Sequence, residues 1–145
     1  MISRRSVRNI LKSSVGAALC CLSLHASPQD LIAHRDSDVE TLTRNEARLF
    51  FTMRLKNWPN GTLVKVFVLP DNNALHNRFS NEVLGLYPYQ LRRVWDRQIF
   101  SGTGQAPTTV SSEQEMLDRI ATTPGAIGYA DGPIDNSSIR LLEVR

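Results

Sequence analysis

Two short polar stretches carry the residue types that hold small anions. Asp71-Asn72-Asn73-Ala74 follows an apolar run, and Ser101-Gly102-Thr103-Gly104 lies in the most glycine-rich and polar part of the chain. Backbone amides at the start of a helix or in a glycine-rich turn attract negative charge, and hydroxyl groups can donate hydrogen bonds to it. The candidate ligand-binding residues are Asn72, Asn73, Ala74, Ser101, Gly102 and Thr103.

Each stretch also has a purely structural interpretation. Asp71, Asn72 and Asn73 are residue types common in turns and helix caps, and the negative charge of Asp71 would repel a phosphate. The serine- and glycine-containing stretch lacks the Lys-Ser/Thr ending of a P-loop, so it is also typical of a connecting loop. Both interpretations stay open at each stretch.

The sequence contains no recognisable catalytic or metal-binding motif. His34 and His76 have no cysteine partner and no spacing typical of a metal site. No nucleophile is paired with a base in a known motif. We therefore expect a protein that is not an enzyme and that uses no metal and no cofactor.

Aromatic and arginine side chains form a second group of candidates. Trp58, Tyr87, Trp95 and Tyr129 lie next to turns, where aromatic side chains usually close a core rather than form a binding surface. Several arginines could pair with a carboxylate or a phosphate, but their positions on polar helix faces predict solvated charges. These arginines are Arg78, Arg92 and Arg93.

The first 26 residues have the three-part organisation of a secretory signal. Basic residues between Arg4 and Lys12 precede the apolar stretch Val15 to Leu24, which is shorter than the roughly 20 residues that cross a bilayer as a helix. A small residue, Ala26, closes this stretch. We expect cleavage near Ala26 and export to a compartment outside the cytoplasm, with residues 27–145 forming a single domain.

Two other export routes leave weaker signals. Ser3-Arg4-Arg5 is similar to a twin-arginine signal but lacks the usual aromatic residue that follows. Cys20 or Cys21 could carry a lipid, but Leu19 stands where a small residue is expected. Both cysteines lie inside the predicted signal, so the exported domain cannot form an internal disulfide and depends on its core.

The charge balance changes once the signal is removed. Four of the 17 lysines and arginines lie before Ala26, which leaves 13 basic residues against 14 acidic ones. A nearly neutral domain gives no support for binding to nucleic acid or to an anionic membrane. No later apolar run is long enough to span a membrane.

Helices and strands alternate along the rest of the chain. Thr43 to Glu46 is a capping box that opens a helix, and Ser112 to Glu115 predicts a second one. The nearly continuous apolar run Leu63 to Leu69 predicts a central strand covered on both faces. Other predicted strands are 31–33, 126–130 and 138–144, and other predicted helices follow Asn73 and Pro88, with a loop from Phe100 to Pro107. This order predicts a layered α/β domain, an α-β-α sandwich.

The stretch from Leu42 to Asp131 resembles the phosphate-type periplasmic solute-binding proteins of ABC transporters, in particular their short relatives. The resemblance rests on a series of motifs in a fixed order. They are Leu42-Thr43 with Phe50-Phe51, Trp58-Pro59-Asn60-Gly61, Arg78-Phe79, Trp95, Phe100-Ser101-Gly102 and Pro124-Gly125-Ala126-Ile127-Gly128-Tyr129. It implies one lobe of a type II periplasmic binding protein fold, a periplasmic location and a ligand-binding protein without enzymatic activity.

Two departures from that family shape the functional expectation. Full-length members bind their oxyanion between two lobes, and Asp71 to Ala74 stands where they have a Ser-Gly-Thr loop. We expect a solute-binding-like protein that binds a small phosphate-like anion weakly, or with a second wall from a homodimer or an envelope protein partner. The alternative is a ligand-free accessory module of a cell-envelope complex.

Overall fold

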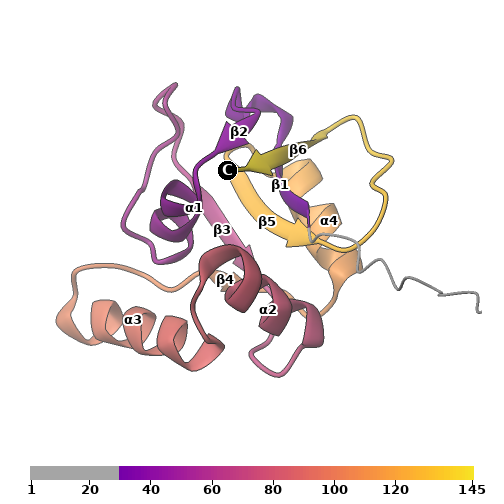
Figure 1. Cartoon of the computed structure of the whole chain (residues 1–145). Helices are drawn as coiled ribbons and strands as arrows, with labels where there is room; N and C mark the ends of the chain where they lie inside the picture. Colours follow the sequence, from indigo (N-terminus) through magenta and orange to yellow (C-terminus); the bar gives the residue numbers. More distant parts are fainter. Residues whose placement is uncertain (1–29) are drawn as a thin grey trace, which may run out of the picture.

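The computed structural model describes residues 30–145, and the predicted signal lies outside this part of the chain. Its centre is a six-stranded mixed sheet with the order β2-β6-β1-β5-β3-β4 (Figure 1). The strands are β1 (Asp30–His34), β2 (Thr41–Leu42), β3 (Lys65–Val68), β4 (Thr108–Thr109), β5 (Ala126–Ala130) and β6 (Ile139–Val144). The helices are α1 (Arg44–Phe51), α2 (Ala74–Arg78), α3 (Pro88–Ser101) and α4 (Glu113–Thr122), with a turn of 3₁₀-helix at Arg35–Ser37 and of π-helix at Phe79–Leu84.

Strand direction changes across the sheet. β1 is antiparallel to both of its neighbours, β5 and β6. β3 is parallel to β5 and β4, and β2 is parallel to β6. The carboxyl ends of β3 and β5 therefore lie at the same edge of the sheet.

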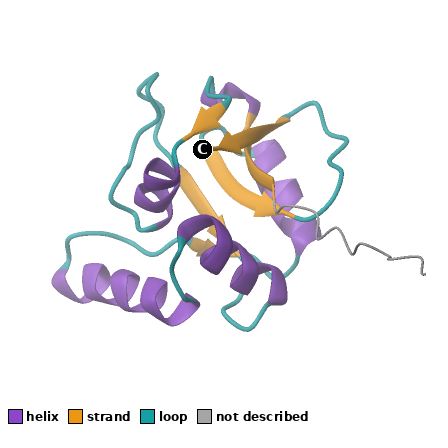
Figure 2. Ribbon diagram, viewed as in Figure 1, coloured by secondary structure: helices purple, strands orange, loops and turns teal. Residues whose placement is uncertain are grey.

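Helices cover both faces of the sheet, which confirms the predicted layered α/β fold. Figure 2 shows α4 on one side of the strands and α1 and α2 on the other. The two faces of β5 alternate accordingly, because Gly128 lies against Met116 and Ile120 of α4 while the ring of Tyr129 stacks on Phe79. A Cβ at residue 128 would overlap the Met116 side chain, so a glycine here lets α4 approach closely.

Local signals account for most element ends. Thr43 and Glu46 form the predicted capping box at the start of α1, with the Glu46 amide donating to Thr43 Oγ1 (3.1 Å) and the Thr43 amide to Glu46 Oε2 (2.8 Å). Gly85 takes the left-handed conformation after the π-helical turn, and Pro88 is the first residue of α3.

Three details differ from the sequence prediction. The strand predicted as central, β3, is second from the sheet edge, although Val66 and Phe67 are buried as expected for a strand covered on both faces. The second capping box is displaced, because the Glu115 carboxylate accepts from the amide and hydroxyl of Ser111 instead of closing on the cap residue Ser112. The loop predicted from Phe100 begins later, because α3 continues to Ser101.

A continuous apolar core lies between the sheet and its helices. Trp58, Trp95 and Tyr129 are each at most 2% exposed, so these aromatics close the core as predicted, whereas Tyr87 is 56% exposed. Both tryptophans also donate an indole hydrogen bond to a backbone carbonyl. Within residues 30–145, no helix has the length and apolar character needed to cross a bilayer.

Candidate functional site

The segment Asp71–Asn73 connects the carboxyl end of β3 to α2. Asn73 caps α2, because its Oδ1 accepts hydrogen bonds from the amides of Leu75 (2.8 Å) and His76 (3.3 Å). Asn72 and Ala74 are exposed on either side of this cap. Asn73 therefore has a structural role, and Asn72 is a solvent-exposed residue beside it.

Asp71 is paired with an arginine from α3. Arg92 Nε and Nη2 donate to the two carboxylate oxygens of Asp71, each over 3.0 Å. These hydrogen bonds raise the pKa of Arg92, against the opposing effect of its partial burial. The predicted repulsion between Asp71 and an anion is thus offset by a cation beside it. The guanidinium has five N–H donors, so donors remain after the pair has formed.

A second arginine–carboxylate pair lies at the end of β5. Arg78 Nη2 donates to Asp131 Oδ2 (2.6 Å), and the Asp131 amide donates to Glu113 Oε1 (2.7 Å). Arg78 and Arg92 were predicted as solvated charges, and the structure shows both paired with aspartates. The sequence could have pointed to Asp131, because this residue directly follows β5. Parallel strands such as β3 and β5 have their carboxyl ends at the same edge of the sheet.

A buried histidine lies beneath the Asp71 pair. His76 is fully buried, and its Nδ1 lies within hydrogen-bond distance of the Tyr129 hydroxyl, which accepts from the Leu69 amide (2.8 Å). The hydroxyl can donate its own proton to Nδ1 in the neutral tautomer that carries the ring proton on Nε2. Nε2 lies 3.9 Å from Asp71 Oδ1 and has no hydrogen-bond partner within residues 30–145.

Acid should destabilise the domain through His76. Burial lowers the pKa of His76, with Asp71 opposing this effect and Arg92 adding to it. Below the unfolded value of about 6.5 the unfolded chain binds a proton that the folded protein rejects. The contribution of neutral His76 to the free energy of unfolding is therefore fully present above about pH 6.5. It decreases as the pH falls from that value toward the lowered pKa of the folded state.

Urea unfolding between pH 7.5 and pH 5 measures this effect. The His76→Gln variant should lose the pH dependence in this window, whereas His34→Gln should retain it. A dependence that persists unchanged in His76→Gln would assign it to another group.

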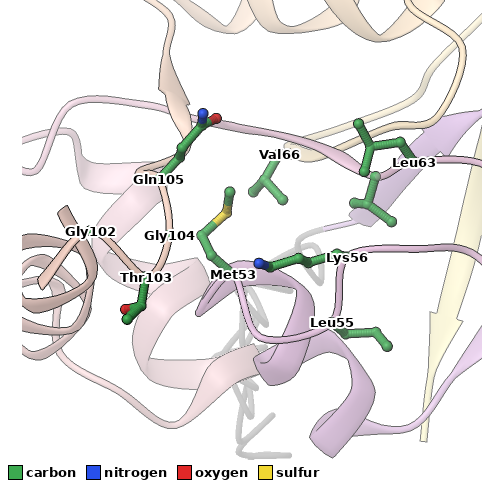
Figure 3. Close-up of a pocket in the computed structure, with 10 residues that line it drawn as sticks. Met53, Leu55, Lys56, Leu63, Val66, Gly102, Thr103, Gly104 and Gln105 are labelled. Atoms are coloured by element: carbon green, nitrogen blue, oxygen red, sulfur yellow. The ribbon is translucent and has the colours of Figure 1, made fainter.

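The second predicted stretch lies at the other end of the sheet. Arg92, near the start of α3, contacts Asp71, whereas Ser101 is nine residues further along this helix, about 14 Å away. Gly102 and Thr103 line a cavity with Leu63, Val64 and Val66, which lie at the amino end of β3 (Figure 3). Asn72 and Ser101 therefore do not form one site.

The backbone amides of this second stretch are already used. The amides of Thr103 and Gly104 donate to the carbonyl of Gln98, and the amide of Gly102 donates to Ile99. Gly102 is the left-handed cap that ends α3. These hydrogen bonds satisfy the carboxyl end of the helix, so the amides do not form a cradle for an anion. The hydroxyls of Ser101 and Thr103 bond to each other (2.8 Å) and remain exposed.

Three solved structures share the arrangement of this chain. They are an ABC-type phosphate transport receptor from Vibrio cholerae (TM-score 0.62, 13% identity), a substrate-binding protein with bound phosphate from Clostridium perfringens (0.62, 16%) and PstS from Borrelia burgdorferi (0.59, 13%). The chain has the fold of part of a phosphate-type binding protein. In each case the match covers 80% of this chain but only 44–46% of the solved one. No family model and no curated protein matches the sequence.

Proposed function

We propose that this protein is an exported, periplasmic solute-binding-like protein of the phosphate type that holds a small oxyanion at the carboxyl edge of β3. Asn72, Asn73 and Ala74 form the turn that faces the anion, and Arg92 supplies positive charge. The observation that carries the proposal is the Arg92 guanidinium beside this turn, on a fold shared with phosphate receptors. The protein acts in transport and performs no catalysis.

The anion site is open in a single chain. The recess lined by Asp71 and Arg92 has a volume of about 550 Å³ and is also lined by Tyr87, Tyr89 and Arg93. The turn at residues 72–74 adjoins it through Asp71 and is not part of its lining. A small ligand is usually covered on most sides, often by two domains. A second copy of the chain or an envelope protein would complete the wall and raise the affinity.

Thermal-shift titration of the exported domain with phosphate and with sulfate tests the proposal. A ligand at 100 times its Kd adds about 2.7 kcal/mol of stability, which raises Tm by several degrees in a domain of this size. Asp71→Asn should increase the affinity several-fold, because it removes a negative charge and frees donors of Arg92. Asn72→Ala should decrease the affinity.

Lys65→Gln is the matched control, because Lys65 is an exposed cation at the amino end of β3 and does not line this recess. Its affinity for phosphate should be close to that of the unchanged protein. The absence of a shift with either anion at millimolar concentration, in a folded protein, would exclude anion binding by the single chain.

A specific observation favours the alternative function, an accessory module of an envelope complex. Tyr87 and Tyr89 are 56% and 58% exposed and stack on each other, with ring centroids 5.7 Å apart. Exposed tyrosines with an adjacent arginine, here Arg93, are the residue types that dominate protein interfaces. Loss of partner recruitment in a Tyr87→Ser/Tyr89→Ser variant, with recruitment retained in Asn72→Ala, would separate the two functions.

A further inference from the structure

A groove beside the carboxyl half of α3 adjoins the amino end of β3, away from Asn72. It consists of two adjoining recesses of about 370 and 330 Å³ that share Met53, Lys56 and Thr103. We call it the α3 groove. Figure 3 shows the side chains of Met53 and Lys56 extending into the larger recess, opposite Leu63 and Val66.

The smaller recess is strongly cationic. Arg54, Lys56 and Arg97 line it, and no carboxylate lines either recess among the described residues. All three side chains are on exposed residues, and none has an ion-pair partner within residues 30–145. Asp96 adjoins Arg97 in sequence but forms no ion pair with it in the described part of the chain. Three unpaired like charges around one hollow repel each other, and a bound anion would relieve that repulsion.

The larger recess is mainly apolar. Leu63 is 57% exposed here, and Met53 and Leu55 are partly buried against the core. Val64 and Val66 form the floor, and both are buried. An apolar hollow that continues into a cationic one matches a ligand with an apolar tail and an anionic head.

The backbone at Met53 adds an independent observation. Met53 follows α1 with φ of 62°, and the Arg54 amide donates to Leu49 while the Met53 amide donates to Phe50. This is the helix-ending motif in which glycine usually occupies the left-handed position. Here a methionine occupies it, and its flexible, apolar side chain lies where the two recesses meet. Unfavourable backbone conformations of this kind are concentrated at functional sites.

We propose that the α3 groove is a second binding site, which takes an amphipathic anion of small-molecule size. The carboxylate or phosphate head lies between Arg54, Lys56 and Arg97, and the alkyl tail lies along Leu63 and Met53. Thr103 lines both recesses beside these cations. This site is separate from the proposed oxyanion site at Asn72 and does not depend on it.

Isothermal titration calorimetry with octanoate and with octyl phosphate tests the site. The ligand that binds more tightly identifies the preferred head group, carboxylate or phosphate. Each methylene removed from the tail should weaken binding about fourfold, so hexanoate binds more weakly than octanoate. Acetate, which has only the head, and octanol, which has only the tail, should each bind at least about tenfold more weakly than octanoate. Arg97→Gln or Lys56→Gln should reduce the affinity about tenfold.

Matched variants distinguish this site from the surrounding surface. Arg93→Gln on the same helix and Lys65→Gln on β3 remove exposed cations outside the groove and should leave octanoate binding unchanged. Leu63→Ser, at an exposed position, should weaken octanoate but not acetate. Asn72→Ala should weaken phosphate binding and leave octanoate binding unchanged. The proposal is wrong if neither amphiphile binds, or if the Arg93 and Arg97 variants lose affinity equally.

Discussion

Replacing Gly125 by alanine should lower the free energy of unfolding by about 3 kcal/mol or more. Gly125 has φ of 82°, and a Cβ there would overlap the backbone carbonyl oxygen of Leu63. The carbonyl of Gly125 accepts from the Trp58 indole (3.0 Å) and from the Lys65 amide (3.0 Å). Any shift that relieves the overlap therefore weakens two hydrogen bonds that join the turn before β5 to the core and to β3.

Gly61→Ala is the control, measured by urea denaturation at pH 7.5. Gly61 has a similar φ of 87°, but nothing lies within 4 Å of its added Cβ. Its alanine variant should lose only about 1 kcal/mol, the cost of the left-handed backbone. Equal losses at Gly61 and Gly125 would show that the contact with Leu63 contributes nothing beyond backbone conformation.

Replacing Tyr129 by phenylalanine should cost about 2 to 3 kcal/mol, although it removes one oxygen atom and leaves the ring in place. The Tyr129 hydroxyl is the acceptor for the buried Leu69 amide (2.8 Å) and lies within hydrogen-bond distance of His76 Nδ1. Both groups would remain in the core without that partner. Burial also raises the pKa of Tyr129, so the hydroxyl keeps its proton at any pH used for the measurement.

Tyr89→Phe provides the reference for this change, because Tyr89 is 58% exposed and its hydroxyl is free to bond to water. Its stability should change by no more than about 0.5 kcal/mol. A double-mutant cycle with His76→Phe separates the contribution of His76 from that of the Leu69 amide. Tyr129→Phe should cost less stability when the imidazole has already been removed. If Tyr129→Phe costs no more stability than Tyr89→Phe, the hydrogen bonds that join Tyr129 to Leu69 and His76 do not stabilise the fold.

Local chemistry made most of the fold predictable. A threonine and a glutamate three residues apart identify the start of α1, Pro88 begins α3, and the run of branched residues around Val66 forms a strand. These signals need no knowledge of distant residues. The displaced cap at Ser111 shows the limit, because adjacent serines offer Glu115 two equivalent partners.

The site was less predictable because its contacts join distant parts of the chain. Asp71 and Arg92 are 21 residues apart, and they meet only because α3 is held in place by hydrogen bonds from Trp95 and Gln98 to the end of α1. The separation of Asn72 from Ser101 follows from the 14-residue length of α3, which runs from Arg92 beside Asp71 to the other end of the sheet. The position of β3 in the sheet depends on β4, a pair of threonines with no apolar pattern to reveal it.

The sheet ends on both sides in a strand of two residues, β2 and β4. A long, exposed edge strand can form backbone hydrogen bonds with a strand of another chain. Very short edge strands are a common protection against this pairing. Association by strand addition is therefore disfavoured here. Assembly with a second copy or another protein is expected through side chains on the helices and loops, so substitutions at Tyr87 and Tyr89 should affect it more than changes at Thr41 or Thr108.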